Sequence, residues 1–431
     1  MAQLKVLISG AGIAGNALAF WLLKLGHSVT VVERFPALRT SGLQVDLRGY
    51  GIQVLKLMGL EQAFRSKSAP EQGLQVVDKS GRRWAYFPAN KSGKGLQSFT
   101  TDWEIMRGDL CQLLHDATGN RAKYMFDTSI ASFSQTEKAV HVQFADGTND
   151  QFDLLVGADG LGSRTRKMMI HNDDPGAVDG FTPLGKSYAA YFTIPRPIRN
   201  GEGYVATFYT ATKTRFIMTR RHSPQRIQVY LMCNSESEKL QKAHRQDVKV
   251  EKEVFSEIFQ DAGWQAKEIL TALQTSDDFY CERMALVKMD SWSRGRVALV
   301  GDAAYCPSAN TGMGTTSAFV GAYILAGEIG RHCGTSGHDH SAARDNITAA
   351  LEEYDRKLRP FMDQVTKGID GDSALYKFMP TGPIGITMLN AFMGLMALLR
   401  LNVLGEWVLK EDVKDWTLPK YKELLGDQVD N

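Results

Sequence analysis

Three glycines and one acidic residue near the start of the sequence have the spacing of a dinucleotide site. Gly10, Gly12 and Gly15 follow an apolar run, and a second apolar run leads to Glu33. The first glycine allows a sharp turn, the second lets a pyrophosphate approach the backbone, and the third lets helix and strand pack closely. Phosphates would lie at the helix N-terminus, where free N–H groups and the helix dipole favour an anion. Because an acid after the second strand can hydrogen-bond an unphosphorylated ribose, the stretch predicts binding of FAD or NAD.

A second loop suited to phosphates follows the apolar strand predicted at 152–156. It contains Asp159 and Gly160 and is followed by basic residues. An aspartate followed by glycine is also a common turn, so the loop could serve only to change the chain direction.

A third glycine-bearing segment begins at the strand predicted at 297–300. Asp302 lies at its carboxyl end, where ligands of open α/β sheets bind. Gly312 and Gly314 would let the N-terminus of a helix predicted at 315–330 approach a flat ring. The positive end of that helix would then stabilise negative charge developing on the ring.

Arg107 lies in a segment whose apolar spacing over 103–114 predicts a helix, just inside the helix start. A cation in the first turn is disfavoured by the helix dipole, so this position invites an anionic partner. The alternative is an ordinary solvated surface arginine.

Composition limits the classes to which the protein can belong. The 431 residues are enough for two or three domains with sizeable cores. The 50 Lys and Arg nearly cancel the 48 Asp and Glu, which gives no electrostatic case for nucleic acid. Five scattered cysteines without a CxxC motif indicate a reducing compartment, and we expect a cytoplasmic protein. No metal site is assigned, because Cys333 with His332, His338 and His340 is better interpreted as part of a Gly/Ser-rich loop between helices.

An aromatic-rich region between 186 and 281 changes to strand periodicity. It predicts an antiparallel sheet followed by a helix at 250–259, with strands at 187–193, 204–210, 215–220 and 226–233. Four side chains are candidates for a substrate pocket beside this sheet: Tyr191, Tyr209, Arg215 and His222. Each could equally be structural, and none is assigned as a general base.

The apolar stretch at 383–399 is near the lower length limit for a membrane span and contains Asn390. A helix packed on the protein is the favoured interpretation. Membrane contact through 383–405 is the less favoured alternative.

The motifs GAGIAG…VVER, MRGDL with Arg107, GADGLGSRTR and GDAAYCPSANTGMG occur in an order that resembles the class A FAD-dependent monooxygenases, the para-hydroxybenzoate hydroxylase-like family. The segments SGLQVDLRG and DWTLPKY resemble its tetracycline-inactivating branch. The resemblance implies an α/β fold in which a Rossmann-like FAD-binding domain is interleaved with an antiparallel-sheet substrate domain and followed by a C-terminal helical segment. The implied boundaries are 1–72, 103–180 and 282–378 for the FAD-binding domain, 73–102 and 181–281 for the substrate domain, and 379–431 for the helical segment.

The same resemblance implies roles for individual residues. The glycine motif and Glu33 would hold the ADP half of FAD, Arg107 would contact the pyrophosphate or ribityl region, and Asp302 would hydrogen-bond the ribityl chain. Asp159 is associated with both FAD and transient NAD(P)H. The complete set of cofactor-binding candidates is Gly10, Gly12, Ala14, Gly15, Glu33, Arg34, Arg107, Asp159, Asp302, Pro307, Gly312 and Gly314. Tyr305 and Thr316 depart from the histidine and asparagine that are frequent in relatives.

The implied reaction uses NAD(P)H to reduce the flavin and O₂ to form a C4a-hydroperoxide. That species would insert one oxygen atom into a medium-sized aromatic, polyketide-like or terpenoid molecule, by hydroxylation, epoxidation or Baeyer–Villiger insertion. Two alternatives are a flavin dehydrogenase or reductase without oxygen transfer and a non-catalytic flavin-binding redox module. A flavin halogenase is disfavoured because no two tryptophans form a Trp-x-Trp pair.

Overall fold

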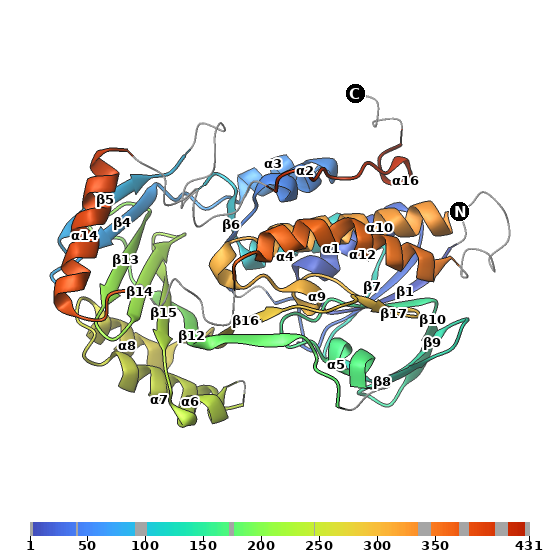
Figure 1. Cartoon of the computed structure of the whole chain (residues 1–431), viewed down its shortest axis with the longest axis horizontal. Helices are drawn as coiled ribbons and strands as arrows, with labels where there is room; N and C mark the ends of the chain where they lie inside the picture. Colours follow the sequence, from blue (N-terminus) through green and yellow to red (C-terminus); the bar gives the residue numbers. More distant parts are fainter. Residues whose placement is uncertain are drawn as a thin grey trace.

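The structure is a computed structural model of the whole chain, shown in Figure 1. It describes residues 3–39, 42–90, 101–171, 176–244, 246–334, 346–369, 379–400 and 413–426. His338 and His340 lie outside these residues.

A six-stranded sheet, parallel except for one edge strand, forms the centre of one half of the molecule. Its spatial order is β17 (Ser293–Arg294), β18 (Val297–Leu299), β11 (Leu154–Gly157), β1 (Lys5–Ser9), β2 (Ser28–Val32) and β7 (Lys123–Met125). The strands are short and almost wholly apolar, as expected for a parallel sheet covered on both faces. One face carries α1 (Ile13–Lys24), α4 (Arg107–Ala117), α10 (Gly314–Cys333) and α12 (Ile347–Thr366) (Figure 1).

The other face of this sheet is covered by α5 (Arg164–His171) and a three-stranded antiparallel sheet (Figure 1). That small sheet consists of β8 (Ile130–Gln135), β9 (Val140–Phe144) and β10 (Asn149–Phe152). In β9, buried and exposed residues alternate, because one side of the strand packs on the core and the other faces water.

A mostly antiparallel seven-stranded sheet forms the second half of the molecule. Its order is β16 (Tyr280–Val287), β12 (Phe181–Pro195), β15 (Arg226–Asn234), β14 (Arg215–Arg221), β13 (Val205–Ala211), β4 (Gly73–Val77) and β5 (Arg83–Pro88). Three helices pack on one face: α6 (Glu238–Ala243), α7 (Val248–Phe259) and α8 (Ala266–Thr275). The long strand β12 runs from this sheet towards the parallel sheet and links the two halves (Figure 1).

The predicted fold class is therefore confirmed, with a parallel sheet, a mostly antiparallel sheet and C-terminal helices. The exact domain boundaries stay a prediction. The strand β16 remains in the seven-stranded sheet through Val287, beyond the predicted boundary at 281.

A two-stranded ribbon of β3 (Gln44–Asp46) and β6 (Glu104–Met106) connects the two halves. The prediction of a helix over 103–114 was wrong at its start, because Glu104–Met106 pairs with β3 and the helix begins at Arg107. Pairing with a distant strand overrode the local helical spacing. Among the described residues, the chain also forms the shorter helices α2 (Gly49–Leu57), α3 (Glu61–Ser66), α9 (Asp302–Tyr305) and α16 (Lys422–Leu425) and the 3-10 turn η1 (Ala309–Thr311).

The apolar C-terminal stretch forms α14 (Pro383–Leu398), which packs on β4 and β5 at the outer end of the seven-stranded sheet (Figure 1). Met393 and Ala397 contact Val76, Ala85 and Phe87. The opposite side of the helix exposes a stripe of apolar side chains: Ile384, Met388, Phe392, Leu395 and Leu398. Among the helices in the described part of the chain, none is both long enough and apolar enough to cross a bilayer.

Candidate active site

Three loops converge at the carboxyl edge of the parallel sheet, because β1, β11 and β18 are neighbours in it. Ser9 pairs with Gly157, and Gly157 pairs with Leu299, so each chain leaves the sheet at the same level. The first and second loops touch. A Cβ on Gly10 would lie only 2.6 Å from the carbonyl oxygen of Ala158, and the φ of +110° at Gly10 also favours glycine.

The glycine motif leaves the start of α1 open for an anion. Gly12 is the N-cap and provides no side-chain hydrogen bond to the first turn. A Cβ on Gly15 would lie 2.0 Å from the carbonyl oxygen of Gly10, so only glycine allows this close approach of helix and turn. Glu33 accepts a 2.9 Å hydrogen bond from the backbone N–H of Ala11, which holds its carboxylate beside the motif.

Arg107 extends towards the same place from the first position of α4. Its Nη2 atom lies 3.8 Å from the position of a Cβ on Gly12, and its side chain packs closely against Gly42. Burial alone would lower the pKa of the Arg107 guanidinium. Nearby acidic groups, of which Cys111 and Tyr280 have the largest effects, outweigh burial and raise this pKa. The arginine is therefore a half-buried cation beside the glycine turn and not an ordinary surface residue.

Asp302 begins α9 directly after β18. Its side chain is exposed to solvent, but protein surrounds it on several sides. This burial raises the pKa of the carboxyl, and Glu282 adds a smaller effect in the same direction. That combination describes a group on the wall of an internal cleft. The position of a Cβ on Gly314, at the start of α10, lies 3.9 Å from Oδ1 of Asp302, so the third loop contributes a carboxylate and a helix N-terminus to one wall.

The cofactor-binding candidates Ala14, Pro307 and Gly312 lie in or beside the third loop. Gly301 has a φ of +66°, and a Cβ there would lie 2.8 Å from Cβ of Ala14, which brings α1 and the third loop into contact. Pro307 is buried, and Gly312 has a φ of +64° at the end of η1. These three loops are thus assembled as predicted from the sequence, whereas their individual contacts with a nucleotide remain predictions.

Two of the cofactor-binding candidates, Asp159 and Arg34, make other contacts in the structure. Asp159 accepts hydrogen bonds from Ser163, the backbone N–H of Arg164 and both donors of Thr165, at 2.5 to 3.1 Å, so its carboxylate caps the start of α5. Arg34 is exposed, and its guanidinium lies 4.9 Å from the centroid of the Phe35 ring at the rim of the first loop.

An aromatic cluster covers the face of the seven-stranded sheet that is turned away from α6, α7 and α8. Tyr191 contacts Tyr230 edge to face at 5.6 Å between centroids and Tyr280 at 4.9 Å. Leu43 packs against the same cluster, and its carbonyl accepts a 2.8 Å hydrogen bond from the backbone N–H of Arg107. The aromatic face and the cofactor loops are therefore direct neighbours.

Tyr209 and Arg215 are not part of this cluster, and their grouping with Tyr191 is corrected by the structure. The hydroxyl of Tyr209 donates to the carbonyl of Ala262, and Arg215 forms an ion pair with Asp261 beside α7. Both side chains project from the helix-covered face of the sheet. The strand periodicity was right, but alternation along a strand does not by itself tell which of its two faces meets the cofactor.

A polar network beside the aromatic cluster joins the candidate His222 to residues that were not singled out from the sequence. The Nε2 atom of Gln228 is 3.3 Å from Nδ1 of His222, and its Oε1 accepts from the backbone N–H of Gln44 at 2.9 Å. Tyr230 also donates to Oε1 of Gln228, at 3.4 Å. Burial, together with nearby Arg226, lowers the pKa of His222, so its neutral ring can accept or donate a hydrogen bond at neutral pH.

The network continues into a buried ion cluster. Arg220 donates to both carboxylate oxygens of Glu71, at 2.7 and 2.6 Å, and also to Glu104, which in turn accepts from Gln44. Burial is the main cause that raises the pKa of Glu104 to about 8, and Arg220 only partly offsets it. Two carboxyl groups thus share one guanidinium, and the raised pKa favours the protonated form of Glu104 at neutral pH.

A weak sequence signal for these residues existed. Gln228 lies between two apolar residues in β15. Glu104 lies between Trp103 and Ile105 at the start of β6. Arg220 gives a weaker signal, because it belongs to the polar end of β14. Polar residues in strand interiors are expected to be paired or functional, but their partners lie on other strands.

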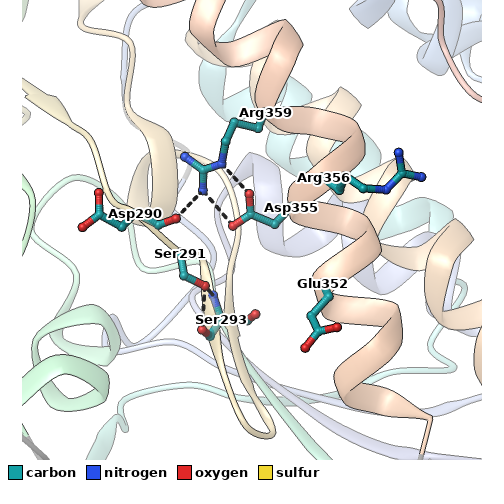
Figure 2. Close-up of a pocket in the computed structure, with 7 residues that line it drawn as sticks. All are labelled: Asp290, Ser291, Ser293, Glu352, Asp355, Arg356 and Arg359. Atoms are coloured by element: carbon teal, nitrogen blue, oxygen red, sulfur yellow. Dashed lines mark hydrogen bonds and ion pairs between the residues drawn. The ribbon is translucent and has the colours of Figure 1, made fainter.

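Two cavities lie away from the cofactor loops. One depression has a volume of about 300 Å³, and several of its lining groups bond to one another: Figure 2 shows Arg359 held by Asp355 and by the carbonyl of Asp290. A second cavity of about 380 Å³ is lined by Leu286, Lys288, Lys367 and Ile369, among others. Ile369 also packs against the aromatic cluster, so this cavity adjoins the aromatic face of the sheet.

Comparison with known proteins agrees with this geometry. The protein family described as "FAD binding domain" matches residues 3–367. The chain is 50% identical over 435 residues to the FAD-dependent monooxygenase asL4 of Sarocladium schorii, covering 99% of this chain and 100% of that protein. It is 40% identical to the flavin-dependent monooxygenase eupH of Phoma sp, covering 92% and 93% of the two chains. The crystal structure of tetracycline destructase Tet(55) is similar over 97% of this chain and 99% of that chain, with a TM-score of 0.79 and 28% identity.

Proposed function

Since the chain belongs to the FAD binding domain family and is an FAD-dependent monooxygenase, we propose that it uses NAD(P)H and O₂ to insert one oxygen atom into a medium-sized aromatic, polyketide-like or terpenoid molecule. The related monooxygenases asL4 and eupH support the insertion of oxygen, and a role in secondary metabolism is part of the proposal. The reaction would be a hydroxylation, an epoxidation or a Baeyer–Villiger insertion.

The residues present fit the flavin nucleotide. The uncapped N-terminus of α1 and the guanidinium of Arg107 suit the diphosphate, and the carboxylate of Glu33 suits the adenosine ribose. Asp302, exposed on the wall of the cleft, suits the ribityl hydroxyls. When bound, the flavin accepts hydride from the nicotinamide and activates O₂.

The chain itself contributes binding, orientation and exclusion of water. The positive end of α10, which begins at Gly314 beside Asp302, would stabilise negative charge on a bound flavin ring. The aromatic face of Tyr191, Tyr230 and Tyr280 would supply an apolar wall that limits the access of water. Oxygen transfer from the flavin needs no side-chain nucleophile, and none is assigned.

One observation carries the proposal: Leu43 packs on the Tyr191 cluster while its carbonyl binds the backbone of Arg107. Arg107, which we propose binds the cofactor, and the aromatic wall, which we propose binds a flat apolar substrate, therefore both contact the segment that contains Leu43. Polar groups within the wall, Gln228 and His222, would orient a substrate hydroxyl or carbonyl through hydrogen bonds.

The proposal is tested by screening metabolites for stimulated NAD(P)H oxidation. Purified holoenzyme is supplied with NADH or NADPH and a panel of phenolic, polyketide and terpenoid compounds, including compounds of the size and aromatic character of tetracycline. We expect at least one compound to accelerate O₂ consumption and to gain the mass of one oxygen atom.

The same measurement separates the alternatives. Accelerated NAD(P)H oxidation with a dehydrogenated or reduced product, and no incorporated oxygen, would identify a dehydrogenase or reductase. Very slow NAD(P)H oxidation that no compound stimulates would favour a redox module without catalytic turnover.

A further inference from the structure

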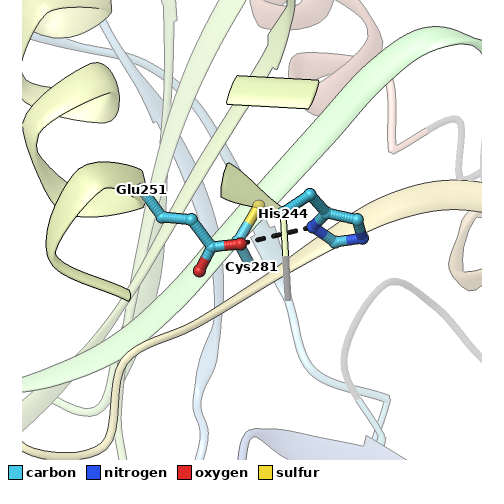
Figure 3. Close-up of side chains that lie close together, drawn as sticks. All are labelled: His244, Glu251 and Cys281. Atoms are coloured by element: carbon cyan, nitrogen blue, oxygen red, sulfur yellow. Dashed lines mark ion pairs between the residues drawn. The ribbon is translucent and has the colours of Figure 1, made fainter. Parts of the chain in front are cut away.

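Three potential metal ligands meet on the helix-covered face of the seven-stranded sheet. His244 ends α6, Glu251 lies in the first turn of α7, and Cys281 is in β16. One ligand atom from each residue, the imidazole nitrogen, a carboxylate oxygen and Sγ, lies within 4.8 Å of the others (Figure 3). Glu251 and Cys281 are buried, and His244 is largely buried.

The histidine and the glutamate lie within ion-pair distance, which the dashed line in Figure 3 marks, but they are not hydrogen-bonded to each other. Nδ1 of His244 lies 3.3 Å from Oε1 of Glu251, yet this buried nitrogen has no hydrogen-bond partner in the part of the chain that the structure describes. Two ligand atoms bound at about 2.0 Å to one tetrahedral ion would themselves be ~3.3 Å apart. The separation and the missing hydrogen bond are both what two ligands of a common cation show.

The ring of His244 is also held in place from the other side. It packs edge to face against Tyr188 at 5.9 Å between centroids, which directs Nδ1 towards Glu251. Metal-binding sites require ligands whose orientation is restricted in this way.

The chemistry of the ligands selects the ion. A nitrogen, a thiol sulfur and a carboxylate oxygen are the ligand types of Zn²⁺, whereas Mg²⁺ and Ca²⁺ prefer oxygen alone. We propose that His244, Glu251 and Cys281 bind one Zn²⁺ ion, with water as the fourth ligand. Binding converts the Cys281 thiol to a thiolate and releases its proton, and Sγ moves closer to the other two ligands.

An ion bound at this position would link three elements of the substrate half of the molecule: α6, α7 and β16. Cys281 projects towards the helices, while its neighbours Tyr280 and Glu282 project from the other face of β16 towards Arg107. An ion bound there would join the ends of α6 and α7 to the strand that carries part of the cofactor cleft. Zn²⁺ should therefore raise the thermal stability of the holoenzyme.

The test compares zinc binding by matched variants of the holoenzyme. Chelator-treated protein is titrated with Zn²⁺ against a chromophoric competitor, and bound zinc is counted by elemental analysis. Cys281→Ser and His244→Ala remove one ligand each. Cys233→Ser is the control, because Cys233 is also a buried thiol on this face of the sheet but lies outside the cluster. Flavin content and circular dichroism establish that each variant is folded.

We expect about one Zn²⁺ per chain in the wild type and in Cys233→Ser, and binding at least about tenfold weaker in Cys281→Ser and His244→Ala. Replacing Zn²⁺ with Cd²⁺ should give a thiolate-to-metal absorption band that Cys281→Ser lacks. Wild-type protein that binds no Zn²⁺, or equal binding by all four proteins, would overturn the proposal. Because His244 is partly exposed, its variant tests the site even if Cys281→Ser does not fold.

Discussion

The guanidinium of Arg220 on β14 donates a hydrogen bond to the buried carboxyl group of Glu104 on β6, although the two residues are 116 positions apart in the sequence. The pair joins the ribbon beside the cofactor loops to the seven-stranded sheet. Glu71 binds the same guanidinium through both of its oxygens, so one arginine neutralises a cluster that contains two carboxyl groups.

Removal of the guanidinium should strongly destabilise the protein. Arg220→Met would leave Glu71 and Glu104 buried without their cation, which we expect to lower the free energy of unfolding by about 3 to 5 kcal/mol. Chemical denaturation measures this change. Arg356→Met is the control, because Arg356 pairs with Glu353 at the surface and should leave stability nearly unchanged. Equal effects of the two substitutions would contradict the importance of burial.

Glu104 should make stability depend on pH. Its pKa is raised to about 8 in the folded protein, so between its ordinary value near 4.5 and about 8 the folded state holds a proton that the unfolded chain releases. Its contribution to stability is fully present at low pH and is lost as the pH rises towards 8, by at most about 1.4 kcal/mol per pH unit.

Glu104→Gln tests this assignment because the amide cannot titrate. The free energy of unfolding is measured for the wild type and the variant at several pH values between about 5 and 8. The difference between the two proteins should change steadily with pH, in favour of the variant at the alkaline end. A constant difference would show that Glu104 is not the group that titrates.

Substitutions of Gly12 and Gly15 in the first motif should have different effects on folding and on FAD binding. Gly15→Ala places a Cβ 2.0 Å from a backbone carbonyl and should disrupt the fold of the first loop. Gly12→Ala meets only the tip of Arg107 at 3.8 Å, so the protein without flavin should retain its melting temperature while FAD affinity falls because the methyl group occupies space near the diphosphate. Differential scanning fluorimetry with and without FAD distinguishes these outcomes. Unchanged FAD binding by folded Gly12→Ala would argue against diphosphate binding there.

Asp302 should be required for flavin retention. Asp302→Ala removes a carboxylate from the wall of the cleft, and we expect the dissociation constant of FAD to rise roughly tenfold or more, as for loss of hydrogen bonds to a charged group. Flavin fluorescence in equilibrium dialysis measures it. Asp290→Ala provides the comparison, since Asp290 lines the depression in Figure 2, which lies away from the cofactor loops. A similar loss of flavin from Asp302→Ala and Asp290→Ala would show that Asp302 has no specific role in flavin binding.

The two faces of the substrate sheet should respond differently to loss of an aromatic ring. Tyr191→Leu alters the wall of the proposed substrate site and should raise KM roughly tenfold for a substrate found by the metabolite screen. Tyr209→Leu removes a side chain on the helix-covered face, with its hydrogen bond to Ala262, and should reduce stability with little change in KM. Steady-state kinetics and thermal melting of both variants test the assignment. A larger increase in KM for Tyr209→Leu than for Tyr191→Leu would show that the helix-covered face, and not the aromatic face, lines the substrate site.

The sequence alone was sufficient where a local pattern has one structural solution. The spacing of Gly10, Gly12 and Gly15 determines a strand, a tight turn and a helix, because a Cβ at the first or third position would collide with the backbone. The same holds for the strand after which Asp302 begins the third loop. Adjacent parallel strands then bring such loops to one edge, so the convergence of the three loops could be predicted from the sequence.

Only the tertiary structure decided which side chains share a face. Strand periodicity predicted the strands of Tyr191 and Tyr209, but the pairing register places Tyr191 beside the cofactor loops and Tyr209 beneath the helices. Register also brings Glu104 to Arg220 and Cys281 to His244. These contacts depend on hydrogen bonds and packing between distant strands and helices, and no spacing within a single segment contains that information.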